Sequence, residues 1–149
     1  MTQKDFEQAY IRYFTRQKGV EDLEHLKEKD RVHLRYALNT NKRARDLIGY
    51  IEVKYNPDWQ RTRLLDVGCA YGGTCIEAGK KGAVSWGVDI EEKYIELARE
   101  NAKGLEIDVK LEQLDITDSR ARKKLPLGVF DFVIVSDVFE HVYDTAGML

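Results

Sequence analysis

Apolar side chains near the start of the chain recur at helical spacing. Phe6, Tyr10, Tyr13 and Phe14 predict an amphipathic helix. A second helix is predicted by apolar residues that share one face, namely Ala44, Leu47, Ile48, Ile51 and Tyr55. We expect Thr40 or Asn41 to cap its start and Pro57 to mark its end. The charged segment 19–31 is expected to be exposed.

From residue 63 the pattern changes to short apolar runs that alternate with amphipathic segments. Strands are predicted at 64–67, 84–89, 109–114 and 130–136, and helices at 72–80 and 91–103. Gly104 is expected to end the second of these helices. The run FDFVIV is apolar enough for a strand that is buried on both faces. This alternation predicts an α/β fold with a doubly wound, mostly parallel, Rossmann-like sheet.

The two patterns suggest a helical segment over residues 1–60 and an α/β cofactor-binding domain over residues 61–149. Doubly wound sheets usually have more than four strands, so this domain reads as incomplete. A fourth strand with an open apolar edge invites pairing with another chain. We therefore expect either a longer natural protein or a partner, such as a second copy, that covers this edge.

Composition narrows the classes of function. The chain has 149 residues, 43% of them hydrophobic, and a formal net charge of −2. This balance gives no global attraction to nucleic acid or to an anionic membrane. No apolar run approaches the roughly 20 residues of a membrane helix, and the start lacks the apolar core of a signal peptide. The sequence therefore predicts a cytoplasmic protein without membrane or nucleic-acid partners.

Local features of the sequence support the same view. Cys69 and Cys75 lack nearby histidines, so no metal site is expected. The basic residues at 42, 43 and 45, and those in the run 120–124, are expected to face water.

Candidate chemistry lies where the predicted strands end, because open parallel sheets bind ligands at the carboxyl ends of their strands. The first strand ends at Asp66 and a glycine-rich turn. Gly68, Ala70 and Gly72 are small residues that allow a ligand to approach the backbone closely. The fourth strand ends at Ser136, which we include among the candidate binding residues.

Acids also end the second and third predicted strands. Asp89 has two carboxylate oxygens for the two hydroxyls of a ribose, and Asp115 is a candidate acceptor for the amine of adenine. Ile90 and Ile116 follow these acids and are candidates to sandwich the adenine ring. A single Asp after a strand is more often a turn residue or a helix cap. The prediction of a nucleoside site therefore depends on the acids occurring at successive strand ends.

The segments LLDVGCAYGG, GVDI, LEQLDITD and FDFVIVSDVFEHV together resemble the class I S-adenosylmethionine-dependent methyltransferases over residues 62–143. The glycine loop, Cys69 included, resembles the family's D-x-G-x-G-x-G element, with Ala70 in place of the central glycine. The resemblance implies that this loop lies against the methionine half of S-adenosylmethionine. It also implies that Asp89 binds the ribose and that Asp115 contacts the adenine.

The ending SDVFEHV resembles an element of methyltransferases that act on small molecules, quinones, lipids and sugars. The resemblance thus implies methyl transfer to a small-molecule acceptor, with this chain supplying the cofactor-binding half. His141 is the best candidate for a general base, since imidazole titrates near neutral pH. The alternative is an ordinary helix residue that packs against a neighbour. The predicted helices either pack on the sheet or carry His33, Arg35 and Tyr36 to the acceptor.

Three other functions stay open. The loop can be written G-x-A-x-x-G, close to the dinucleotide fingerprint of NAD(P)-dependent oxidoreductases. Asp66 argues against that function because it occupies a position that is usually apolar. A non-catalytic cofactor-binding scaffold is the second alternative. A nucleic-acid methyltransferase is the third, and the absence of an Asn-Pro-Pro-Tyr-type element argues against one chemistry of that class.

Overall fold

The computed structural model describes residues 3–21, 23–126, 128–143 and 145–148. Four strands form one sheet in the order β3-β2-β1-β4, and every neighbouring pair is parallel. The strands are β1 (Arg63–Val67), β2 (Val84–Asp89), β3 (Lys110–Gln113) and β4 (Phe132–Val135). The predicted α/β fold with a parallel, Rossmann-like sheet is confirmed. Because the strands are parallel, their carboxyl ends meet at one edge.

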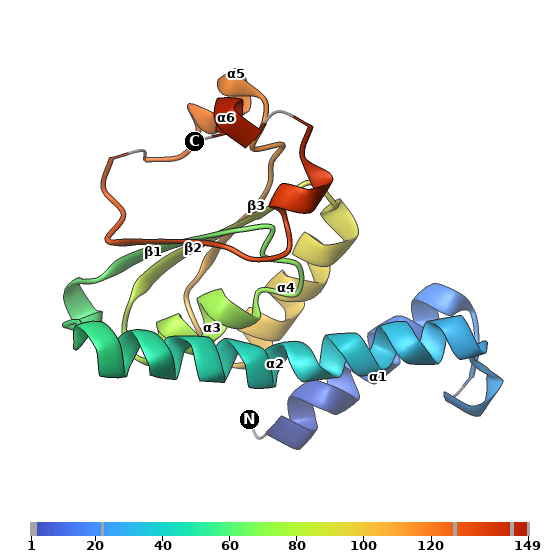
Figure 1. The fold of residues 1–149 in the computed structure, drawn as a ribbon. Coiled ribbons are helices and arrows are strands. Elements are labelled where there is room, and N and C mark those ends of the chain that lie inside the picture. Colours follow the sequence, from blue (N-terminus) through green and yellow to red (C-terminus); the bar gives the residue numbers. More distant parts are fainter. Residues whose placement is uncertain (1–2, 22, 127, 144, 149) are drawn as a thin grey trace.

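The main helices lie on one face of this sheet (Figure 1). They are α1 (Gln3–Lys18), α2 (Glu28–Tyr55), α3 (Gly73–Lys80) and α4 (Glu92–Gly104). The α3 and α4 helices connect consecutive strands, α2 packs against α3, and α1 packs against α2 and α4. The shorter elements are η1 (Leu23–His25), η2 (Trp59–Arg61), α5 (Ser119–Arg122), η3 (Phe139–His141) and α6 (Thr145–Met148). In Figure 1, α5 and α6 lie on the opposite side of the sheet from α2.

The core between the sheet and the helices is tightly packed around Gly87 of β2. A Cβ at this position would lie 2.8 Å from the Cys69 Sγ, 2.8 Å from a Leu111 methyl and 2.9 Å from the Cys75 Sγ. Both cysteines are buried and free. The absence of a side chain at Gly87 therefore leaves room for Cys69 of the loop after β1, Cys75 of α3 and Leu111 of β3.

The second helix begins earlier than predicted. α2 starts at Glu28, and its N-cap is Lys27 rather than Thr40 or Asn41. The reason is that Leu34 continues the apolar face toward the N-terminus and is 6% exposed. The segment 19–31 is also not uniformly exposed, because Leu26 is buried against α1. The helix ends at Tyr55, two residues before Pro57, as predicted.

The fourth strand is not buried on both faces. β4 is the edge strand of the sheet, and the side chain of Val133 is 55% exposed. Its other face packs on the α2 side, where Phe132 and Ile134 are in contact with the cluster around Ile48. Apolar composition predicted a strand here, but it did not show whether both of its faces are covered.

The end of α4 also differs in detail from the prediction. The helix ends at Gly104, but the left-handed residue that follows is Glu106, with φ of 57°. The amide of Ile107 then donates to the carbonyl oxygen of Ala102. The turn after α4 therefore uses Glu106 rather than a glycine in the left-handed conformation.

Candidate functional site

A cavity of about 1070 Å³ opens at the carboxyl edge of the sheet. Its wall combines the segments that follow all four strands with one face of α2. This volume reaches the upper end of the roughly 300–1,000 Å³ typical of small-molecule sites. The cavity is lined by most of the residues predicted from the sequence, namely Asp66, Gly68, Cys69, Ala70, Asp89, Ile90, Asp115, Ile116, Ser136 and His141.

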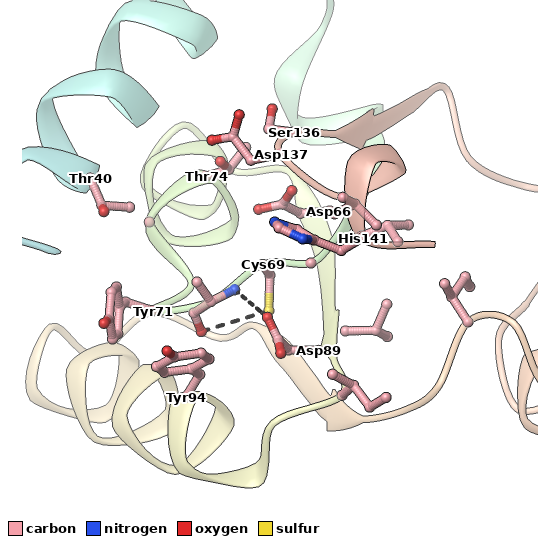
Figure 2. Close-up of a pocket in the computed structure, with 18 of the residues that line it drawn as sticks. Thr40, Asp66, Cys69, Tyr71, Thr74, Asp89, Tyr94, Ser136, Asp137 and His141 are labelled. Carbon is pink, nitrogen blue, oxygen red and sulfur yellow. Dashed lines mark hydrogen bonds between the residues drawn. The ribbon is translucent and has the colours of Figure 1, made fainter. Parts of the chain in front are cut away.

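The loop after β1 is held to β2 by its backbone. The amides of Gly68 and Cys69 both donate to the carbonyl oxygen of Val88, at 2.8 and 3.0 Å. Ala70 adopts a left-handed backbone with φ of 44°, and its amide donates to Asp89 Oδ2 at 2.9 Å (Figure 2). A non-glycine residue in this region is strained and persists where its surroundings hold it. The strained residue of the loop is thus tied to the candidate ribose-binding acid.

Two glycines of the loop are explained by packing. Both Gly68 and Gly72 have φ of 73°. A Cβ on Gly68 would overlap the side chain of Val138, and one on Gly72 would lie 2.9 Å from the Ala98 Cβ. Gly72 is not among the residues that line the cavity. Its small size lets α4 approach the loop, whereas the sequence prediction attributed it to contact with a ligand.

Cys69 also differs from a simple ligand contact. Its side chain is 4% exposed and belongs to the core cluster with Cys75 and Ile95. Burial raises the pKa of this thiol, with the charges of Asp66 and Asp89 adding to the effect. The thiol therefore stays protonated within the core. At this position the loop backbone, rather than the thiol, faces the cavity.

Asp66 at the end of β1 is an almost fully buried acid in the cavity wall. It is 4% exposed, and burial raises its pKa to about 7, while a hydrogen bond from Thr74 partly opposes the shift and the charge of Asp89 adds to it. A carboxyl with this pKa changes its protonation near neutral pH. A cationic ligand in the cavity would favour its ionised form.

We expect stability to fall with rising pH because of Asp66. Its unfolded-state pKa is about 3.9, below the folded value of about 7. Between these values the folded chain holds a proton that the unfolded chain has released, so the stability present at low pH is lost as the pH rises toward 7. Linkage gives a loss of about 2–3 kcal/mol between pH 5 and 7.5.

Urea unfolding at the two pH values measures this loss, with Asp66→Asn as the comparison. The variant is expected to lose less stability over the same interval, because the amide does not titrate. An identical pH dependence in both proteins would remove Asp66 as the cause.

Asp89 uses both carboxylate oxygens within the chain. Oδ2 accepts from Ala70, and Oδ1 accepts from the amide of Glu91 at 2.9 Å. Each oxygen has a second lone pair, so the carboxylate retains the capacity to accept from two hydroxyls. The two backbone donors orient it at the cavity wall.

Asp115 closes a local turn at the end of the segment after β3. Its Oδ1 accepts from the Thr117 amide at 2.9 Å and from the Thr117 hydroxyl at 2.6 Å. These bonds lower the pKa of Asp115 and keep it ionised. Asp115 therefore serves as a turn residue, which is the usual role of such an acid, and it also lies in the cavity wall. Ile90, next to Asp89, is 59% exposed and offers an apolar surface in the same wall.

Comparison with known proteins identifies the family. A family model described as a methyltransferase domain matches residues 59–149. The chain belongs to the methyltransferase-domain family. The resemblance to class I S-adenosylmethionine-dependent methyltransferases is thereby confirmed.

Two curated relatives of this methyltransferase domain are similar to it in sequence. Ajmaline N-methyltransferase from Rauvolfia serpentina is 32% identical over 98 residues, which cover 64% of this chain and 32% of the relative. A ubiquinone biosynthesis O-methyltransferase from Methylocella silvestris is 33% identical over 89 residues, which cover 58% of this chain and 32% of the relative. The matched part of the chain thus spans about a third of the length of these relatives.

Solved structures share the fold. Magnesium protoporphyrin IX methyltransferase from Synechocystis PCC 6803, solved with bound SAH, superposes with a TM-score of 0.62 at 19% identity. The match covers 83% of this chain and 53% of that one. The bifunctional kinase-methyltransferase WbdD superposes with a TM-score of 0.57 at 28% identity, covering 72% and 24% of the two chains.

The fold also brings to the cavity residues of α2 that the sequence analysis missed. Arg43 of α2 lines the cavity, and its guanidinium lies 3.5 Å from the carboxylate of Asp137. Thr40 and Leu47, which flank it on the same helix, line the cavity as well. Arg43 and Leu47 lie four residues apart within the predicted helix, and this spacing was the available signal. Arg43 was expected to face water, and its side chain is 51% exposed; it also lines the cavity, which the sequence analysis did not predict.

The residues that the sequence analysis proposed for the acceptor differ in where they lie relative to the cavity. His141 in η3 lines the cavity and is exposed, and Figure 2 shows it on the same side of the site as Asp66. Arg35 is exposed and is not among the described residues that line the cavity. The side chains of His33 and Tyr36 lie outside those that the structure describes.

Two further properties concern the described part of the chain only. It contains no group of three or more His, Cys, Asp or Glu side chains arranged to hold a metal ion. None of its helices combines the length and the apolar character that crossing a bilayer requires.

Proposed function

We propose that this chain binds S-adenosylmethionine and supplies the cofactor-binding half of a methyltransferase for a small-molecule acceptor. One observation carries the proposal: Asp66, Asp89 and Asp115, from the ends of three successive strands, line the same cavity as the glycine loop. Carboxylates suit a cofactor with a sulfonium, an ammonium and a ribose diol, because they attract its positive charges and accept hydrogen bonds from its hydroxyls. The cavity also provides apolar surface at Ile90 and Ile116 for a planar base.

The residues of the chain have separate tasks in this function. When bound, the sulfonium cofactor supplies an activated methyl group. Asp89, oriented by the amides of Ala70 and Glu91, accepts hydrogen bonds from the ribose. Asp115 and the two isoleucines hold the adenine end, and the glycine loop supports the methionine end. The contribution of the protein is mainly alignment and exclusion of water.

Arg43 is assigned to the methionine carboxylate. Among the described residues that line the cavity, it is the only lysine or arginine. A guanidinium binds carboxylates through paired hydrogen bonds. Asp137 lies 3.5 Å from it and orients the guanidinium at the mouth of the cavity.

His141 is the proposed general base for acceptors that must lose a proton. It lies after β4, at the cavity and close to Ser136 in the chain. The test is the pH–rate profile of His141→Ala in the full-length protein. An unchanged rate together with an unchanged profile would remove this assignment.

The proposed cofactor is tested by calorimetric titration of the chain with S-adenosylhomocysteine, followed by competition with NAD. Binding that NAD does not displace supports the proposal. Displacement by NAD favours the oxidoreductase alternative instead. Absence of methyl transfer by the full-length protein despite cofactor binding would favour the scaffold. The cytoplasmic location and a homo-oligomer that covers β4 stay predictions from the sequence.

A further inference from the structure

The N-terminal helix contacts the cofactor site through a cluster of tyrosines. Tyr10 of α1 is 2% exposed, and its ring meets that of Tyr71 edge-on, with centroids 5.0 Å apart. Tyr71 in turn meets Tyr94 edge-on at 5.1 Å. Tyr71 and Tyr94 both line the cavity and lie side by side at its rim in Figure 2. A residue near the start of the chain therefore supports a wall of the cavity.

One contact of α1 fixes the glycine loop. Burial raises the pKa of Tyr10, and a side-chain hydrogen bond with Tyr71 adds to the effect, so Tyr10 remains uncharged. Tyr71 directly follows Ala70, the residue with the strained left-handed backbone. A fixed Tyr71 side chain restricts the backbone on one side of Ala70, whose amide donates to Asp89 on the other.

A second contact of α1 fixes the start of α4. The hydroxyl of Tyr13 donates to the carbonyl oxygen of Lys93 at 3.1 Å. Lys93 lies two residues after Glu91, whose amide is the other backbone donor to Asp89. The two tyrosines, one helical turn apart on α1, thus lie beside the two loops that orient the same carboxylate.

We propose that α1 is a clamp on the cofactor site, in which Tyr10 and Tyr13 are positioning residues for the two backbone donors to Asp89. The clamp rests on the proposed function for its role in cofactor affinity. Its structural effect, holding Ala70 and Glu91 against Asp89, belongs to the chain without any ligand. The hydroxyl groups act through Tyr71 and Lys93 and do not contact the cofactor.

The test is amide hydrogen exchange of the ligand-free chain in Tyr10→Phe and Tyr13→Phe. Both variants keep the ring and its packing, so they are expected to fold. Tyr10→Phe is expected to speed exchange at the Ala70 amide about fivefold, the net value of one neutral hydrogen bond. Tyr13→Phe is expected to act in the same direction at the Glu91 amide. Tyr50→Phe, at a 56% exposed tyrosine of α2, is the matched control.

Amides within the strands distinguish the clamp from general stabilisation. If the tyrosines merely stabilise the fold, the amide of Leu65 in β1 accelerates by the same factor as that of Ala70. Acceleration confined to the two loops supports the clamp. Uniform acceleration, or none at either loop amide, overturns it.

Titration with S-adenosylhomocysteine completes the experiment. The dissociation constant is expected to rise about fivefold in Tyr10→Phe and to stay unchanged in Tyr50→Phe. An unchanged constant in Tyr10→Phe removes the role of the clamp in affinity. A wild-type chain that does not bind this ligand contradicts the proposed function, while the exchange rates still decide the clamp.

Discussion

Replacing Asp89 with asparagine is expected to weaken binding of S-adenosylhomocysteine about 100-fold, or about 2.8 kcal/mol. The carboxylate accepts from the amides of Ala70 and Glu91, one on each oxygen. In the variant, the new NH₂ group faces one of these N–H donors, so one backbone bond is lost. The charge that strengthens hydrogen bonds to the ribose hydroxyls is lost as well. Hydrogen bonds to a charged group contribute about 1.5–3 kcal/mol each, so the weakened bonds to the two ribose hydroxyls account for this effect, while the lost backbone bond leaves the side chain less well oriented.

Isothermal calorimetry measures the affinity, and Asp108→Asn is the matched control. Asp108 is an exposed acid that precedes β3, at the opposite end of the strand from the cavity. Its replacement removes the same charge without touching the site, so the affinity is expected to stay unchanged. Equal affinity of wild type and Asp89→Asn would remove the ribose assignment. Circular dichroism of both variants confirms that the comparison is made between folded proteins.

Gly72→Ala is expected to lower the free energy of unfolding by about 2–3 kcal/mol. Two costs contribute to this loss. The left-handed backbone at φ of 73° costs an alanine about 1–2 kcal/mol, partly offset because alanine has less freedom in the unfolded chain. The new methyl would also lie 2.9 Å from the Ala98 Cβ, and overpacking of this kind typically costs about 1–3 kcal/mol.

Gly128→Ala separates the two costs. Gly128 has φ of 81°, and a Cβ there would meet nothing within 4 Å. Its replacement carries the backbone cost alone, so a loss of about 1 kcal/mol is expected. Urea denaturation of the two variants measures the difference. If both variants lose the same stability, the contact between the glycine loop and α4 does not explain why position 72 is a glycine.

Local pattern was sufficient to predict most of the fold. The parallel sheet and the helices between its strands follow from short apolar runs that alternate with amphipathic segments. The three acids at successive strand ends followed from the same reasoning, because every parallel strand delivers its carboxyl end to one edge. Asp66, Asp89 and Asp115 accordingly line one cavity.

Pattern was insufficient where a role depends on a distant partner. Arg43 is a charged residue on a helix, and its place at the cavity follows from how α2 packs beside the sheet. Gly72 resembles a ligand-binding glycine, yet its nearest constraint is Ala98 on the next helix. Val133 is apolar and yet exposed, because the described part of the chain leaves its face of β4 partly uncovered.

The sequence by itself determined the parallel α/β fold, the family and the acids at the carboxyl edge, because periodicity and strand-end chemistry are local properties of the chain. Only the tertiary structure decided that Asp66 is buried with a pKa near 7, and that Asp89 is held by two loops. It also decided that Tyr10 supports Tyr71. Burial and contacts between distant segments depend on which surfaces meet when the helices pack on the sheet, and no local pattern records that.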